Sequence, residues 1–341
     1  MILNVMMINK FSNPFIRFVE HELDRKDVFY FTYGNEIPPD DIRSLDNLVY
    51  YNNIFIRYFV MLYHMYKNDR IVLHGLIDFK VVLLLFFNPW LLKKCYWLIM
   101  GIDLYSYELH RNKKSYRLRE FFRSYVFKNI KYLVTSIDGD YERVKCWYLS
   151  KGERINIYAF PNSVFHPANI KSEIIDEKMN ILVGNSADPS NNHEEIFEML
   201  FNCCLDNVRI YIPLSYGDKE YTKLISKKAK EIFGNKVCIL DCFMNLDDYN
   251  VILSRMDIAI FNHDRQQGLS IIRSLLGHGS KVYLKKNTSS FDMFNKLGVK
   301  VFDLNELNLN ANFNEKEKNI EVITDFYSIK QLKLNLNRLF S

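Results

Sequence analysis

Short apolar runs alternate with longer amphipathic stretches along the whole chain of 341 residues. Runs of the length of a buried strand recur in the first half at 3–8, 28–32, 47–50, 70–73, 97–100, 132–135 and 156–159. The second half repeats the pattern at 179–183, 208–212, 236–240, 258–261, 281–284 and 300–302, with helical stretches at 193–201, 220–233, 247–255 and 269–276. Strands that alternate with helices are typical of parallel sheets covered on both faces. We therefore predict an α/β fold of two Rossmann-like, doubly wound domains.

A polar segment that contains Pro161 and Pro167 separates the two sets of strands. The length agrees with two domains, since a domain has about 150 residues. We place an N-terminal domain at 1–168 and a C-terminal domain at 169–326. Leucines in the last segment, 327–341, partly alternate with polar residues, which indicates a C-terminal helix or tail.

The composition is that of a folded globular chain, with 48% hydrophobic and 25% charged residues. This balance excludes wholesale disorder. Six cysteines in a chain of this length make no disulfide framework, and they indicate buried thiols in a reducing compartment.

Positive charge is concentrated in the first half, where residues 1–170 hold 23 Lys and Arg against 17 Asp and Glu. Segment 111–131 has eight basic residues and one acid, interleaved with aromatic residues. Such a stretch either lies on an anionic membrane surface, through Arg117, Arg119 and Arg123, or is a solvated helix whose aromatic side chains face the core.

The most apolar segment, 81–92, is too short to cross a bilayer core about 30 Å thick as a helix. It is either a buried helix or an exposed wedge with Trp90 at the lipid headgroups. Residues 1–8 lack a basic region and a cleavage site, so we predict a first buried strand there and not a signal peptide.

Two loops at strand ends in the second half suit a phosphate group. Gly184, Asn185 and Ser186 follow the run 179–183, where a glycine turn offers backbone N–H groups to a diphosphate. An ordinary strand-to-helix loop, capped by Asn191 or Asn192, explains that turn equally well.

The segment 264–268, Asp-Arg-Gln-Gln-Gly, lies between the run 258–261 and an apolar helix. The N-terminus of a helix favours anions, and the Arg265 guanidinium can bind phosphate oxygens with two hydrogen bonds. Gln266, Gln267 and Ser270 add neutral hydrogen-bonding groups. The alternative is a surface pair between Arg265 and Asp264.

His74 and Asp103 follow strand-like runs in the first half and are the candidates for a general base. Asp103 is the first candidate and His74 the second, against a loop-capping role for each. Cys238 and Cys242 have no matching pair of ligands, so a zinc site is not expected. The sequence has no P-loop, GxSxG or HExxH motif, and Asp138-Gly139-Asp140 is too common a pattern to indicate a metal site.

Taken together, these segments resemble a known family. The chain is similar to the bacterial glycosyltransferases that move 4-acetamido-4,6-dideoxygalactose (Fuc4NAc) from its dTDP-linked form to a lipid-linked oligosaccharide, as in enterobacterial common antigen assembly. The similar segments are 181–188 with Ser190, Asn191 and His193; 264–268; His74-Gly75; 101–105; and 213–217. The match spans most of the chain, roughly residues 70–300, with these segments in consistent order, and it departs from the family pattern at Met100, Ser215 and Asp264.

The resemblance implies a GT-B fold, in which two Rossmann-like domains face a cleft and the C-terminal domain binds most of the donor. It implies no cofactor and no obligatory metal, and peripheral attachment to the cytoplasmic face of the inner membrane. The implied partners are a dTDP-activated sugar, a polyprenyl-diphosphate-linked acceptor and an anionic membrane surface, with no nucleic acid.

We therefore expect a metal-independent glycosyltransferase. We expect it to act in the synthesis of a cell-surface polysaccharide, either the O-antigen of lipopolysaccharide or the common antigen. Its expected donor-binding residues are Gly184, Asn185, Ser186, His193, Tyr216, Arg265, Gln266, Gln267, Gly268 and Ser270. The alternatives are a sugar-nucleotide epimerase of the same fold, and a non-catalytic donor-binding member of a polysaccharide assembly complex.

Overall fold

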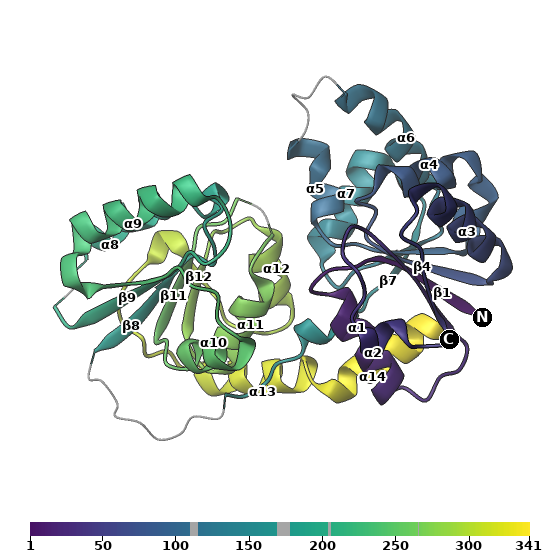
Figure 1. Ribbon diagram of the computed structural model, residues 1–341. Coiled ribbons are helices and arrows are strands. Elements are labelled where there is room, and N and C mark those ends of the chain that lie inside the picture. The colour runs from purple at the N-terminus through teal and green to yellow at the C-terminus, as the bar shows by residue number, and fades with distance from the viewer. Residues whose placement is uncertain (110–114, 169–177, 204–205, 265) are drawn as a thin grey trace. The chain divides into compact units, whose positions relative to one another are not determined.

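The computed structural model describes residues 1–341 except 110–114, 169–177, 204–205 and 265. The chain divides into two compact units (Figure 1). The first comprises Met1–Val164 and Ile329–Ser341, and the second comprises Phe165–Ser328. The boundary expected between residues 168 and 169 lies at the edge of a segment outside the described residues. Residues Ile329–Phe340 form helix α14, which belongs to the first unit.

The first unit is built on a parallel sheet of seven strands in the order β3-β2-β1-β4-β5-β6-β7. The strands are β1 Ile2–Met7, β2 Val28–Tyr33, β3 Leu48–Tyr50, β4 Arg70–His74, β5 Cys95–Leu98, β6 Tyr132–Val134 and β7 Glu153–Ile155. In register, Ile2 on β1 pairs with Val28 on β2 and with Arg70 on β4. The strand order therefore reverses between β1 and β4.

Helices complete the first unit: α1 Ser12–Glu22, α2 Asp40–Arg43, α3 Ile54–Lys67, α4 Phe79–Phe87, the 3₁₀ turn η1 Pro89–Lys94, α5 Ile102–Leu109, α6 Tyr116–Asn129, α7 Asp138–Tyr148 and α14. Side chains of α3, α4, α6 and α7 join those of the sheet in one buried cluster around Trp97 and Phe127, whose rings lie 4.2 Å apart. In Figure 1, α3, α4 and α6 lie side by side over one face of this sheet.

The second unit has a parallel sheet of six strands in the order β10-β9-β8-β11-β12-β13. The strands are β8 Met179–Val183, β9 Val208–Pro213, β10 Val237–Leu240, β11 Ile258–Phe261, β12 Lys281–Leu284 and β13 Phe302–Asp303. The helices are α8 His193–Phe201, α9 Lys219–Phe233, α10 Leu246–Leu253, α11 Leu269–Gly277, α12 Ser289–Lys296 and α13 Lys316–Phe326. Polar side chains begin several of them, as Asp218 does for α9 and Asn245 for α10.

The prediction of an α/β fold with two doubly wound sheets is confirmed, and one strand was misplaced. The run 156–159 was expected to be a strand, but the last strand of the first sheet is β7, where Glu153 pairs with Tyr132. Charged residues are tolerated in β7 because it is an edge strand, with only one neighbour. Ile157, Tyr158 and Ala159 are buried without being part of the sheet.

None of the helices in the described part of the chain is both long enough and apolar enough to span a bilayer. The five cysteines that the structure describes are free thiols, and the prediction of buried thiols is confirmed for Cys95 but wrong for the exposed Cys146 and Cys242.

Candidate functional site

The main candidate site lies where the strand order of the second sheet reverses. β8 has β9 on one side and β11 on the other, so the loops that leave β8 and β11 diverge toward opposite faces of the sheet. A crevice at the carboxyl ends of such a pair of strands is the usual ligand site of doubly wound sheets. The predicted residues Gly184, Asn185 and Ser186 follow β8, and the segment 264–268 follows β11.

Gly184 makes the turn after β8 possible. Its φ of +68° is in the left-handed region, and a Cβ at this position would lie 2.5 Å from His193 Nε2 and 3.0 Å from Asn191 Oδ1. His193 is the first residue of α8 and is fully buried. The absence of a side chain at 184 therefore lets the backbone pass directly against the His193 ring.

Asn191 connects the loops on both sides of this turn. Its side chain is fully buried, and its Oδ1 accepts a hydrogen bond from the Asn185 backbone N–H at 2.9 Å. The same oxygen lies 3.1 Å from His263 Nε2, and the Asn191 amide donates to Ser186 Oγ at 3.3 Å. Asn191 thus joins the loop after β8 to the residues that follow β11.

Asn185 lies between a tyrosine and a second glycine. Its Nδ2 donates to the Tyr216 hydroxyl at 2.9 Å. Gly268, with a φ of +67°, comes so close that a Cβ there would lie 3.1 Å from Asn185 Cγ. The Tyr216 ring is half-exposed, at 49%, while the Asn185 side chain is buried. Asn185, Tyr216 and Gly268 lie far apart in the sequence, in loops that follow three different strands, and the fold brings them together.

Three buried polar atoms in this group have no hydrogen-bond partner among the residues that the structure describes. They are Asn185 Oδ1, His193 Nε2 and Gln267 Nε2. Burial lowers the pKa of His193 to about 4, so its ring is neutral at pH 7. Buried polar groups are normally paired, and unpaired ones indicate a ligand or ordered water at that place. All three atoms are electrically neutral hydrogen-bonding groups.

Helix α11 begins at the same edge of the sheet. Its N-cap is Gly268, and no side chain among the described residues caps it. Ser190 Oγ contacts Gln267 Oε1 at 3.2 Å, which fixes the Gln267 side chain beside the loop after β8. Gln266 is half-buried and Ser270 is exposed in the first turn of α11. Arg265, predicted to bind phosphate, lies outside the described residues.

Asp264 does not lie free in front of this helix. Its carboxylate accepts from Lys285 Nζ at 2.7 Å and from Asn192 Nδ2 at 3.0 Å. Partial burial opposes ionisation, but these hydrogen bonds outweigh it and lower the pKa of Asp264. The negative charge at this departure from the family pattern is therefore compensated by Lys285.

The first unit holds the two predicted catalytic residues, of which Asp103 is almost completely buried, at 1% exposure. Its Oδ2 accepts from Trp97 Nε1 at 2.7 Å and from the Leu76 N–H at 3.0 Å. Its Oδ1 accepts from the backbone N–H groups of Met100 and Leu104. Burial raises the pKa of Asp103, against the effect of these donors. The geometry favours a loop-capping role, and proton transfer by Asp103 stays a prediction.

His74, the last residue of β4, is also buried. Its Nε2 lies 2.9 Å from Asn4 Oδ1, and the Phe15 ring contacts it edge-on at 4.5 Å. Its Nδ1 has no partner in the described part of the chain. Burial lowers the pKa of His74 to about 3, which makes it a weak base at neutral pH. The next residue, Gly75, lies against Asp103, since a Cβ on Gly75 would lie 3.5 Å from Asp103 Oδ2.

One predicted membrane-binding residue requires correction. Arg123 is 6% exposed, donates to the backbone oxygen of Asp103 and the Tyr148 hydroxyl, and pairs with Glu120 at 3.3 Å. A buried guanidinium with these partners cannot contact a lipid surface. Arg117 and Arg119 are exposed on the same helix, α6. The amphipathic pattern of α6 left open which of its arginines faces the core.

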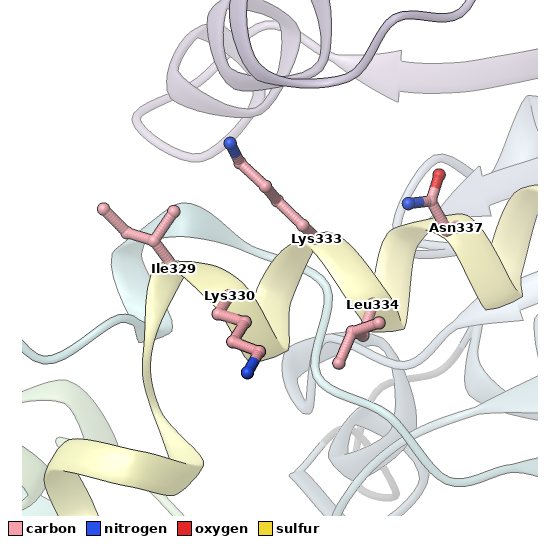
Figure 2. Close-up of a pocket in the computed structure, with 5 residues that line it drawn as sticks. All are labelled: Ile329, Lys330, Lys333, Leu334 and Asn337. Carbon is pink, nitrogen blue, oxygen red and sulfur yellow. The ribbon is translucent and has the colours of Figure 1, made fainter.

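A hollow in the structure lies apart from the predicted site residues. A hollow of about 390 Å³ lies along α14 and is lined by Ile329, Lys330, Lys333, Leu334 and Asn337 (Figure 2), none of which is a predicted site residue. Among the described residues, no group of three or more His, Cys, Asp or Glu side chains is arranged to hold a metal ion.

A family comparison decides the identity of the chain. A model of the 4-alpha-L-fucosyltransferase family, glycosyl transferase group 56, matches residues 4–330. The chain belongs to this family. It is therefore a glycosyltransferase, and the expected resemblance to the Fuc4NAc transferases is confirmed at the level of the family.

Solved structures agree with a GT-B fold for this group 56 glycosyltransferase. HepE from Anabaena, in complex with UDP, has a TM-score of 0.71 at 9% identity, with 99% of each chain covered. Sucrose-phosphate synthase from Thermosynechococcus elongatus has a TM-score of 0.66 at 11% identity over 99% of this chain and 98% of that one. WaaG, a glycosyltransferase of lipopolysaccharide biosynthesis, has a TM-score of 0.56 at 12% identity over 98% and 92%.

Two residues of the site were not predicted as ligand-binding. Asn191 was named as a helix cap and as part of the family-like segment, and His263 was not considered, although both lie inside the hydrogen-bonded group. The sequence could have indicated His263 as a site residue, because it lies two residues after the buried strand β11 and two residues before Arg265.

Proposed function

We propose that this glycosyltransferase transfers a deoxyamino sugar, of the Fuc4NAc type, from a dTDP-linked donor to a polyprenyl-diphosphate-linked oligosaccharide. It would act in O-antigen or common-antigen synthesis, bound peripherally to the cytoplasmic face of the bacterial inner membrane. The observation that carries the proposal is the group of three buried polar atoms without a described partner, on Asn185, His193 and Gln267, around Gly184 and Gly268 at the strand reversal of the second sheet.

The group suits a nucleotide diphosphate. Two glycines bring the backbone close to any ligand, and the N-terminus of α11 supplies a favourable dipole for an anion. Gln267 Nε2 is an unused donor in the described structure. Tyr216 offers a half-exposed ring, to which we assign a contact with the nucleoside part of the donor. HepE, of similar fold, was solved with UDP and with UDP-glucose.

The description of the family supports the proposed sugar class. Its description names a fucosyl group, which is a 6-deoxygalactose, and Fuc4NAc has the same carbon skeleton with an acetamido group at C4. The motifs at 181–193 and 264–268 resemble those of the dTDP-Fuc4NAc enzymes. The lipid-linked acceptor and the membrane location rest on the same resemblance.

We infer that transfer needs no metal ion. The leaving dTDP carries the developing negative charge, and Arg265 together with the N-terminus of α11 would stabilise it. Asp103 is proposed as a positioning residue that holds the loop after β4, because its oxygens are occupied by four N–H donors.

The proposal is tested by measuring release of the nucleoside diphosphate from a panel of dTDP- and UDP-linked sugars, in EDTA, with and without lipid-linked acceptor. We expect release from a dTDP-deoxyamino sugar only when the acceptor is present. Conversion of the donor without acceptor would identify an epimerase, and binding without turnover of any donor would identify a non-catalytic protein. Loss of release in EDTA, restored by magnesium or manganese, would contradict the metal-free mechanism.

A further inference from the structure

The outer surface of α3 is aromatic where a surface helix normally carries polar residues. Phe55, Phe59, Tyr63 and Tyr66 follow one another at a spacing of three or four residues and are 86%, 77%, 57% and 47% exposed. The opposite side of the helix, with Met61 and Met65, is buried against the sheet. An apolar side of a helix normally packs against a core, and this aromatic side of α3 does not.

The aromatic surface continues from α3 to the turn η1. The Trp90 indole donates to the Tyr66 hydroxyl at 2.8 Å, and this hydroxyl donates to Asn88 Oδ1 at 2.7 Å. The Trp90 ring is 55% exposed. Its polar N–H group is therefore paired within the protein while much of its apolar ring remains uncovered, as in aromatic residues at membrane interfaces.

It continues further to α4 and α6. The Phe86 ring contacts Phe87 at 5.3 Å, Phe121 at 5.9 Å and Tyr125 at 5.1 Å. The last three side chains are 67%, 63% and 42% exposed, and Leu118 on the same helix α6 is 66% exposed. The helices α3, α4 and α6 pack in this order in the first unit (Figure 1), so the exposed residues form one surface, here called the aromatic face.

The charge of these segments has one dominant sign. Residues 54–67, 79–94 and 116–129 contain nine Lys or Arg residues and a single acid, Glu120, which is paired with the buried Arg123. The exposed basic residues include Lys67, Lys80 and Lys93, in addition to Arg117 and Arg119. Aromatic and aliphatic side chains beside basic ones, without acids, complement an anionic lipid surface.

We propose that the aromatic face inserts into the headgroup region of an anionic bilayer, with α3 as the principal contact through Phe55 and Phe59. The inference rests on the proposed function, which requires a lipid-linked acceptor, and it assigns the membrane contact to α3, η1 and α4 as well as to the basic helix α6. The aromatic face holds the first unit at the bilayer by apolar contact, and the basic residues add a long-range attraction.

The test compares two double variants of the full chain in sedimentation with vesicles of phosphatidylglycerol and phosphatidylethanolamine. Phe55→Ser with Phe59→Ser removes the centre of the α3 surface. The control is Phe201→Ser with Phe243→Ser, because these residues are as exposed, at 69% and 88%, but lie in the second unit. We expect the first pair to weaken vesicle binding at least about tenfold and the control pair to leave it unchanged. Because all four side chains are exposed, both variants should unfold at the temperature of the parent.

Equal vesicle binding by the two double variants would overturn the proposal. So would a parent dimer in analytical ultracentrifugation that the Phe55 and Phe59 substitutions convert to monomers, since a second copy would then cover the face. Quenching of Trp90 fluorescence by brominated lipids, lost in Trp90→Phe, supports insertion; no quenching contradicts it.

A transfer assay with detergent-solubilised acceptor separates this inference from the proposed function. If transfer in detergent is normal and vesicle binding does not depend on Phe55 and Phe59, the proposed membrane contact of the aromatic face is wrong and the proposed function stands. Absence of transfer in detergent, with vesicle binding that does depend on them, rejects the proposed acceptor and supports the face.

Discussion

The indole N–H of Trp97 donates to Oδ2 of Asp103 at 2.7 Å, inside the first unit and away from solvent. We predict that Asp103→Asn lowers the free energy of unfolding by about 2–4 kcal/mol, because an amide turns an N–H group toward donors that need an acceptor. Denaturant titration measures the free energy of unfolding of this variant. The control is Asp40→Asn, because the Asp40 side chain is 91% exposed.

Transfer activity of the same variants decides the role of Asp103. A positioning role predicts that destabilisation and loss of transfer occur together. A variant with the parent's stability but transfer lowered about 10²–10⁴-fold would instead identify Asp103 as the general base.

Gly184→Ala should reduce affinity for dTDP at least about tenfold, because the new methyl group would lie 2.5 Å from His193 Nε2 and displace the loop after β8. Gly298→Ala is the matched control. The φ of Gly298, +82°, would strain an alanine in a similar way, but an added Cβ at this position would have no atom within 4 Å. Calorimetric titration of both variants measures the difference, and equal dTDP affinities would exclude the Gly184 turn from the donor site.

Gln267→Glu should weaken dTDP binding by about 100-fold or more, since it replaces an unused buried donor with a negative charge near the diphosphate. Gln267→Met, which removes the amide without adding charge, should have a smaller effect. The substitution Gln331→Glu on α14, in the first unit, controls for net charge. If Gln267→Glu binds dTDP as the parent does, Gln267 does not face the phosphates.

Acid should destabilise the second unit through His193. Burial lowers its pKa to about 4 from about 6.5 in the unfolded chain, so the unfolded state binds more protons between these values. Its stabilising contribution is complete above pH 6.5 and falls as the pH decreases toward 4, with a loss of about 2 kcal/mol at pH 5. Denaturant unfolding at pH 7.5 and pH 5 should show this difference reduced in His193→Gln and retained in His21→Gln, an exposed control. An unchanged difference in His193→Gln would show that the acid sensitivity arises elsewhere.

The strands around the donor site could be predicted from the sequence because each is a short apolar run between polar turns. β8, β11 and β12 have the predicted bounds. β7 was misplaced because two of its three residues, Glu153 and Arg154, are charged, and only pairing with β6 makes them a strand. The family motifs likewise indicated the loops after β8 and β11 before their contacts were known.

Contacts between distant segments could not be predicted. The aromatic residues of α3 predict a buried side and the charge of Arg57 an exposed one, and only the structure shows that Arg57 is buried while Phe55 and Phe59 lack cover. Arg123 follows the exposed Arg119 by one helical turn on α6, so the sequence alone does not distinguish the two. The buried position of Arg123 depends on its hydrogen bonds to Asp103 and Tyr148. Three of the four donors to Asp103 lie within six residues of it, in line with the loop-capping alternative, but the fourth, the Leu76 N–H, comes from the loop after β4 and had no local signature.

The central claim, acceptor-dependent transfer of a dTDP-linked deoxyamino sugar, is tested most directly by the mass of the lipid-linked product. The full chain is incubated with dTDP-Fuc4NAc and lipid-linked acceptor in EDTA, and the lipid fraction is analysed by mass spectrometry. We predict that the acceptor gains the mass of one Fuc4NAc residue while an equal amount of dTDP is released. An unchanged acceptor, with the donor either intact or converted to an isomer, would contradict the account.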